Sequence, residues 1–261
     1  MTDNRGQSDE PVLDVLPHYQ EVLDSTDWAS LETPYGTGDL LPAVLARLLH
    51  TDPAVRAAAV EDALRAVTHQ NTIYEATLPV ALYVATILNH PATGAGENRQ
   101  DTNHTPHYPT RAALLDWLSR TAYDANDENV GIGERVRGST FLDESPEVRA
   151  FLDLRPAIYS AVQPLLDHDN TNVREAALIA ALPLAEHPAL APHRDKLVAP
   201  ARRLMNASTD RYRRDRVLEA LRAWGHDISS LENADDVAVR ELRAQRVTER
   251  WAGGCSDNPP F

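Results

Sequence analysis

The chain is poor in several residue types, and each scarcity excludes a class of protein. It has a single cysteine, Cys255, so no internal disulfide can form and a reducing compartment is indicated. No segment approaches the roughly 18 consecutive apolar residues of a membrane-spanning helix. The polar, acidic N-terminus also lacks the apolar core of a signal peptide. We therefore expect a cytoplasmic protein with no membrane association.

Aromatic residues are also scarce, at 6% of the chain, whereas Ala, Leu and Val supply most of its 43% hydrophobic fraction. This balance suits closely stacked helices better than a β-sandwich. No segment keeps the period-2 alternation of apolar and polar residues that is typical of strands. An all-α protein is the expected fold class.

A short phrase recurs along the chain: an acid or amide, a few residues, then Val-Arg opening an alanine-rich run. It occurs around Arg56 and Arg174, with a weaker copy around Arg214. The separations are 174 − 56 = 118 residues and 214 − 174 = 40 residues. They correspond to about three periods and one period of roughly 40 residues, the spacing of helical-pair repeats. The sequence therefore predicts a HEAT-like α-solenoid of stacked antiparallel helix pairs.

Capping residues and amphipathic periodicity place the helices of this array. Asp52-Pro53 and Ser145-Pro146 each combine a side-chain cap with proline at the first helical position. A short helix and a turn are expected over 12–33. The further predicted helices lie near 38–50, 52–67, 76–89, 110–125, 146–167, 171–186, 190–206, 209–224 and 235–251.

These helices form one predicted domain over 12–251, between a disordered tail at 1–11 and a flexible tail at 252–261. Two segments interrupt the rhythm and are expected to be long loops, 91–109 and 126–145. Long loops in compact arrays are often functional or disordered, and in solenoids they tend to project from the binding face. The second segment contains apolar residues with which it could pack, so we favour a functional role for it.

Charge is distributed unevenly over a chain whose net charge is −14. Residues 1–63 carry twelve acidic and three basic residues, whereas 194–222 carry nine basic and four acidic ones. The second loop region, 124–147, has seven acidic residues against two arginines. The overall charge argues against nucleic-acid binding, which requires an excess of basic residues on one face. The basic segment could instead bind an acidic protein or form intramolecular ion pairs.

The least generic segment is the polar stretch that begins at His69. Thr72 and Glu75 have the spacing of a capping box, which predicts a well-capped turn between two helices. The alternative is a small polar pocket of His69, Gln70 and Tyr74 facing two aromatic residues from the preceding segment, Trp28 and Tyr35.

The same residues carry a resemblance. The pattern resembles the N-terminal region of a group of actinobacterial HEAT-repeat proteins over residues 28–90: Trp28, then Tyr35-Gly36 and Asp39, a Leu-rich helix, and His69-Gln70-x-Thr72-x-Tyr74-x-Ala76-Thr77. Asn71 replaces the glycine usual at its position. The resemblance implies a fold and a lineage, and it names no activity or catalytic residue.

No group of residues has the spacing of a metal, cofactor or catalytic site. His104 and His107 with Asp101 lack a rigid scaffold and a third and fourth ligand. Cys255 has no neighbouring base or cationic field that would activate it. We therefore expect neither metal nor cofactor.

The function that fits best is a non-catalytic HEAT-repeat scaffold that binds another protein. A more specific version is an acidic, immunity-type protein that masks a basic partner. The alternative is an enzyme or nucleic-acid-processing module with its site near Trp28, Tyr35, His69 and Tyr74. The candidate partner-binding residues are Trp28, Tyr35, His69, Gln70, Tyr74, Asp127, Glu128 and Glu134.

Overall fold

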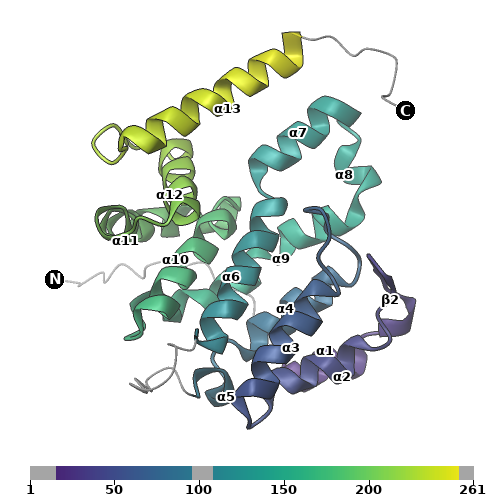
Figure 1. Cartoon of the computed structure of the whole chain (residues 1–261). Helices are drawn as coiled ribbons and strands as arrows, with labels where there is room; N and C mark the ends of the chain where they lie inside the picture. The colour runs from purple at the N-terminus through teal and green to yellow at the C-terminus, as the bar shows by residue number, and fades with distance from the viewer. Residues whose placement is uncertain (1–15, 96–107, 253–261) are drawn as a thin grey trace, which may run out of the picture. The chain divides into compact units, whose positions relative to one another are not determined.

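The computed structural model describes residues 16–95 and 108–252, which are mostly helical (Figure 1). The predicted all-α fold class is confirmed in that the described residues are mostly helical. The chain divides into two compact units, residues 1–197 and 198–261, and each is described by itself. The predicted tail at 1–11, most of the predicted loop at 91–109, and all but the first residue of the predicted tail at 252–261 lie outside the described residues.

The described part of unit 1 contains short 3-10 turns (η) and a two-stranded hairpin among its helices. In chain order its elements are α1 (Tyr19–Ser25), η1 (Trp28–Ser30), β1 (Glu32–Thr33), β2 (Gly36–Thr37), α2 (Leu41–Ala46), η2 (Arg47–Leu49), α3 (Pro53–Arg65), α4 (Thr77–Ile87), α5 (Pro91–Gly94), α6 (Thr110–Asp124), α7 (Asp127–Arg137), α8 (Phe141–Glu144), α9 (Pro146–Val162), η3 (Gln163–Asp167), α10 (Thr171–Leu184) and η4 (Pro188–His193). The helix α11 (Arg194–Ala207) crosses the division between the units. The helices predicted from 38–50 to 171–186 are all present.

Small residues allow the central helices of unit 1 to approach closely. The helix α6 lies against α3 and α10, and α4 lies against α1 and α9. Four alanines of α10 are fully buried, and the Leu-rich η2 packs against α3. Of the predicted α3 face, Ala59 and Ala63 are buried, but Arg56 is more buried than the neighbouring Val55. The alanine pattern therefore predicts the buried residues of α3 and α10 correctly, except that it does not predict the burial of Arg56.

The Val-Arg phrase has one local geometry at all three of its positions. The guanidinium of Arg56 donates to the carbonyl oxygen six residues earlier, that of His50, at 2.7 Å. Arg174 donates to His168 O at 2.6 Å and Arg214 to Ser208 O at 3.3 Å. These carbonyls end the preceding turn and have no partner within a helix, so a forked guanidinium satisfies them well.

In each copy, the residue whose carbonyl oxygen accepts from the arginine also stabilises the turn with its side chain. The ring Nδ1 of His50 accepts from Asp52 N–H at 3.0 Å, and Nδ1 of His168 accepts from Asn170 N–H at 3.1 Å. In the third copy the hydroxyl of Ser208 accepts from Asp210 N–H at 3.1 Å. Each Asp or Asn then caps the next helix through its side chain. The sequence phrase thus encodes a complete helix-to-helix turn.

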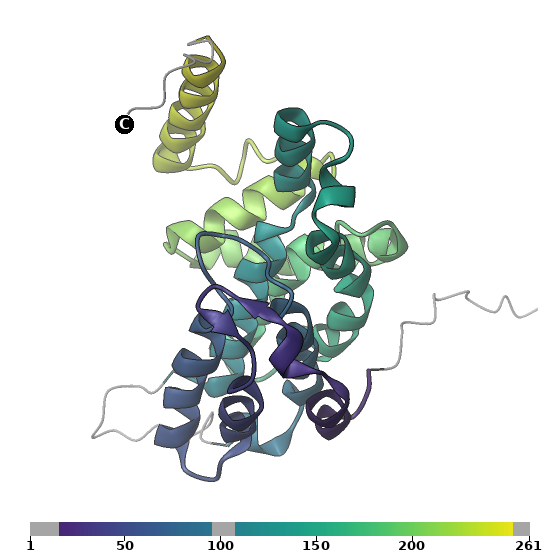
Figure 2. The ribbon, with the colours of Figure 1, turned by 90° about the vertical axis from the view of Figure 1, so that its right-hand side faces the viewer.

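Two expectations about helix starts and loops are wrong. Ser145 makes no side-chain cap for α9, although proline does occupy the first turn. The segment 126–145 is not a loop, because it forms α7 and α8. Asn126 caps α7 by accepting from Asn129 N–H at 2.8 Å, and Gly138 at φ 91° ends it. Figures 1 and 2 show α7 and α8 as a helical hairpin at one end of unit 1, beyond α6 and α9.

Unit 2 contains the end of α11, α12 (Arg211–Ala223) and α13 (Ala234–Ala252). Its basic residues are largely engaged within the unit. Arg214 is buried and forms an ion pair with Asp236 at 2.5 Å, and its guanidinium also donates to Met205 O at 2.6 Å. Arg243 bridges Asp215 and Glu219. The intramolecular alternative for the basic segment is therefore favoured for Arg214, whereas Arg243 lies outside that segment.

Within the described residues, no helix is long and apolar enough to cross a membrane.

Candidate interaction site

The structure brings two of the predicted aromatic site residues together. The rings of Tyr35 and His69 meet edge to face, with centroids 6.0 Å apart. Trp28 instead lies in the core, where its indole N–H donates to Leu23 O at 3.0 Å. Tyr74 is half-buried, and neither it nor Gln70 makes a ring contact with this pair in the described part of the chain. The five residues therefore do not form one pocket.

Tyr35 stands at the tip of the β1–β2 hairpin and is 69% exposed. The antiparallel pairing joins Thr33 to Gly36, whose φ of 133° closes the tight connection. The hairpin is tied to the start of α4: Glu75 Oε2 accepts from Glu32 N–H at 3.0 Å, and Ala76 N–H donates to Glu32 O at 3.2 Å. These bonds fix Tyr35 near His69.

His69 and Thr72 flank a tight turn instead of a capping box. Gln70 and Asn71 both have positive φ, 49° and 57°, and Thr72 N–H donates to His69 O at 3.0 Å. Two consecutive residues with positive φ are the signature of a type I′ turn. The predicted cap at Thr72 is wrong. The helix α4 has no side-chain cap. The hydroxyl of Thr77, its first residue, instead ties the turn to the preceding segment by accepting from Tyr74 N–H at 3.0 Å and donating to Val67 O at 3.1 Å.

The α7–α8 hairpin exposes apolar side chains. No residue of α7 is buried, and Ile132 and Val136, one helical turn apart, are 40% and 69% exposed. Together these two side chains are the α7 face. The hairpin closes where the Phe141 ring lies against Gly133, and the Arg137 guanidinium lies over the same ring at 5.7 Å. The helices are thus held in place while the α7 face stays in solvent.

A buried polar anchor holds the base of α7. Arg155, with a side chain only 2% exposed, pairs with Asp127 Oδ1 at 3.0 Å and donates to the Ala125 carbonyl. Glu186 Oε2 accepts from Asp127 N–H at 2.8 Å. Burial raises the pKa of Glu186 to about 7, and the hydrogen bond from Asp127 N–H and the charge of Arg155 lower it only in part. All three predicted acidic contacts are exposed, but Asp127 is ion-paired with Arg155.

The turn after His69 and the α7–α8 hairpin border one groove of about 430 Å³, which we call the hairpin groove. Its apolar lining consists of Ile73, Val130, Ile132, Val136, Phe141 and Val148. Its polar lining includes Asn71, Thr72, Asp124, Asn129, Arg137 and Glu147. Burial raises the pKa of Asp124 to about 6, and Arg120 lowers it only in part. The two segments that the sequence singled out therefore meet at one site, whereas Asp124 was not anticipated.

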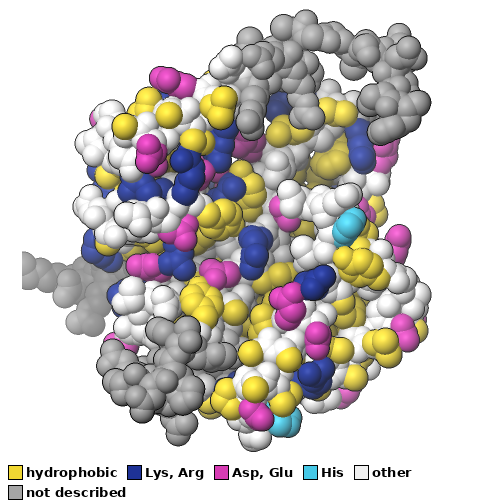
Figure 3. Space-filling model, viewed as in Figure 1, with side chains coloured by type: hydrophobic (Ala, Val, Ile, Leu, Met, Phe, Trp, Pro, Cys, Tyr) yellow, Lys and Arg dark blue, Asp and Glu magenta, His cyan; other side chains and the backbone are white. Residues whose placement is uncertain are grey.

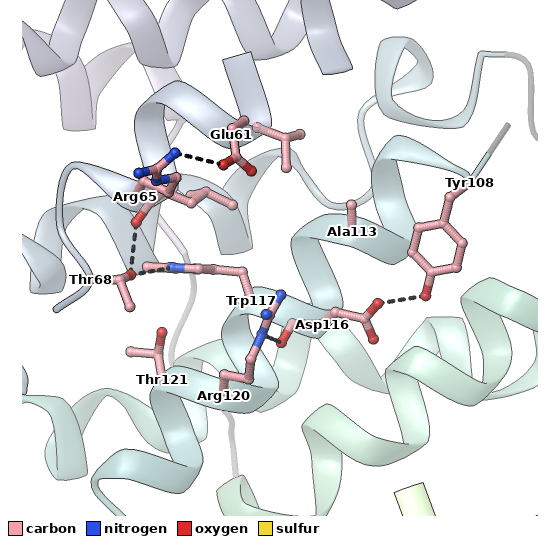
Figure 4. A pocket seen from close by; sticks show the side chains of 11 residues that line it. Glu61, Arg65, Thr68, Tyr108, Ala113, Asp116, Trp117, Arg120 and Thr121 are labelled. Atoms are coloured by element: carbon pink, nitrogen blue, oxygen red, sulfur yellow. Dashed lines mark hydrogen bonds and ion pairs between the residues drawn. The ribbon is translucent and has the colours of Figure 1, made fainter. Parts of the chain in front are cut away.

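A second groove, of about 410 Å³, lies between α3 and α6 (Figure 4). Its polar groups bond to one another: Glu61 with Arg65 at 3.2 Å, Trp117 Nε1–H with Thr68 Oγ1 at 3.0 Å, and the Tyr108 hydroxyl with Asp116 at 2.5 Å. The charges are balanced within the groove, so its lining favours no ligand charge. We regard the hairpin groove as the better candidate site.

Charges of both signs are interspersed with hydrophobic side chains on the face of unit 1 seen in Figure 3. Within residues 16–95 and 108–252, no group of three or more His, Cys, Asp or Glu residues gathers as a metal site. The histidine pair at His104 and His107 lies outside the described residues, as does Cys255.

No family model, curated protein or solved structure matches the chain. The resemblance to actinobacterial HEAT-repeat proteins stays a prediction made from residues 28–90.

Proposed function

We propose that this chain is a non-catalytic, HEAT-like helical-repeat protein that binds another protein through the α7–α8 hairpin. The recurring turn around Arg56, Arg174 and Arg214 supports the repeat architecture, because one hydrogen-bonding scheme recurs at the spacing of helical-pair repeats. Such arrays present extended surfaces to partners.

The exposed α7 face carries the proposal. Arg155 and Phe141 hold α7 in place. Its apolar face therefore cannot become buried by packing against the core of unit 1. Ile132 and Val136 therefore keep apolar area in water next to a groove, which is a mark of interaction surfaces. Moving such a side chain from full exposure to full burial contributes about 1.5–3 kcal/mol. Ile132 and Val136, which are 40% and 69% exposed, would contribute the corresponding fractions in a complex.

The negative charge of the hairpin region supports a basic partner. This chain would then act as an acidic, immunity-type protein that masks that partner. Glu128 and Glu134 are exposed on α7, and the segment 124–147 has an excess of five acidic residues. Complementary charge would steer association and suppress acidic competitors. The acidic residues before Val15 belong to the same negative part of the sequence but lie outside the described residues.

The alternative enzyme or nucleic-acid module has less support. It requires Trp28, Tyr35, His69 and Tyr74 to converge, and Trp28 is packed in the core with its indole N–H satisfied. A nucleic-acid site would require the arginines of unit 2, of which Arg214 and Arg243 are paired with carboxylates.

Site-specific photocrosslinking tests the proposal. A photoreactive residue replaces Val136 in cells that make the protein, and the matched control replaces Leu40, an apolar residue of unit 1 that is 73% exposed. We expect a discrete protein adduct from position 136 and not from position 40. Equal labelling at both positions, or no adduct at 136, would contradict the proposal.

A further inference from the structure

The hairpin groove contains a carboxylate without a counterion. Asp124, in the last turn of α6, is half-buried, and no hydrogen bond or ion pair joins its carboxylate to another described residue. Arg120, one helical turn earlier, acts on it only from a distance, and its Nε–H donates to Asp116 O. A carboxylate that is partly removed from water and has no partner is less stable in its charged form. The raised pKa of Asp124 reflects this cost.

The surroundings of Asp124 specify what could compensate it. Glu147 adds a second carboxylate to the groove lining, whereas the one cation among the lining residues, Arg137, lies over the Phe141 ring. The groove thus offers negative charge beside an apolar wall. An isolated metal ion or amine would satisfy the charge but leave the wall in water.

The wall has the spacing of a helix-binding surface. Ile132 and Val136 are four residues apart on α7, so their side chains form one ridge. An amphipathic partner helix can lay its own i, i+4 ridge against such a row. The net charge of −14 on this chain disfavours a second copy as the occupant and favours a basic one.

We propose that the hairpin groove binds a basic amphipathic helix of a partner protein, with the partner's apolar residues on Ile132, Val136 and Phe141 and its Lys or Arg side chain paired with Asp124. This inference rests on the proposed function and gives it a partner chemistry. The ion pair places a cation against Asp124, and the apolar contact removes the α7 face from water.

The test uses the full chain and a labelled synthetic helix of Leu and Lys residues as the probe, followed by fluorescence anisotropy. Two further peptides are compared with it: one in which Glu replaces every Lys, and one of the same composition rearranged to lose its apolar face. We expect the Leu/Lys helix alone to bind. Binding of the Glu peptide with similar affinity would overturn the inference, as would equal binding of the rearranged peptide.

Matched variants locate the binding. Asp124→Asn should weaken the probe about tenfold, the effect expected for loss of a partly buried charged hydrogen bond. Asp153→Asn removes an exposed carboxylate of α9 and should leave affinity unchanged. Ile132→Ser with Val136→Ser should weaken binding at least as much, whereas Leu40→Ser should not. Equal affinity of the Asp124→Asn and Asp153→Asn variants would refute the role of Asp124.

One outcome separates this inference from the proposed function, and a second contradicts both. If photocrosslinking at position 136 captures an acidic partner, or one whose affinity does not change with Asp124→Asn, the scaffold function stands and the basic-helix inference fails. If sedimentation shows a dimer that Ile132→Ser with Val136→Ser dissociates, a second copy occupies the α7 face and the inference fails as well.

Discussion

The Phe141 ring occupies the space that a side chain on Gly133 would need: a Cβ built on Gly133 would lie 2.5 Å from Phe141 Cε1. This contact joins α7 to α8 and so shapes the wall of the hairpin groove. A real Cβ would push the ring outward and change the angle between the two helices.

Gly133→Ala should therefore loosen the hairpin. Alanine normally stabilises a helix interior by about 0.5–1 kcal/mol relative to glycine, so a loss of stability would identify the clash. We expect faster amide hydrogen exchange across α7 and α8. Gly131→Ala is the matched control, because its Cβ would meet only the end of the flexible Arg135 side chain at 3.4 Å. Unchanged or slower exchange in Gly133→Ala would show that Phe141 does not close the hairpin.

Arg56→Lys should destabilise unit 1. The Arg56 guanidinium is buried and donates to carbonyl oxygens of His50, Thr51 and Ala95, which come from two segments. A lysine ammonium cannot reproduce this fork, and the loss should be about 2–4 kcal/mol of unfolding free energy. Urea denaturation measures it, with the exposed Arg65→Lys as control. A change equal to that of the control would contradict a structural role for the phrase.

Thr77→Ala should cost about 1–3 kcal/mol, because it leaves Tyr74 N–H and Val67 O without their partner in a buried place. Thr72→Ala should cost less than about 0.5 kcal/mol, as is usual at exposed positions. Thermal unfolding of the two variants compares them directly. The opposite order would restore the capping box that the sequence suggested.

That capping box shows where sequence reasoning fails in this chain. Thr72 and Glu75 have the right spacing, but Gln70 and Asn71 adopt positive φ, which local patterns of non-glycine residues rarely reveal. Helix positions were predictable because caps such as Asp52 and Asn170 act within a few residues. They depend little on distant contacts.

The sequence predicts a loop where the α7–α8 hairpin lies, because Gly131 and Gly133 lower helix propensity. The packing that requires Gly133 involves Phe141, which the glycine spacing does not indicate. The sequence does not predict the burial of Arg56, because a charged residue in an amphipathic pattern is usually exposed. It does not single out Asp124 for a related reason: the half-buried position of Asp124 depends on residues of other helices.

Stability should depend on pH through Glu186. Its folded pKa, about 7, lies above the ordinary value of 4.5, so the folded state holds the proton more tightly than the unfolded state. The contribution of Glu186 to the free energy of unfolding is fully present below pH 4.5 and is lost as the pH rises to about 7. The melting temperature should therefore rise between about pH 8 and pH 5 by more in the wild type than in Glu186→Gln. Parallel profiles would show that Glu186 keeps its ordinary pKa.

The central claim, that the α7 face binds a partner protein, is tested most directly by affinity for the partner captured at position 136. Ile132→Ser with Val136→Ser should weaken that complex at least about tenfold, since each side chain loses part of its burial energy. Leu40→Ser should leave it unchanged. If all three proteins bind the partner equally, the α7 face is not the binding surface.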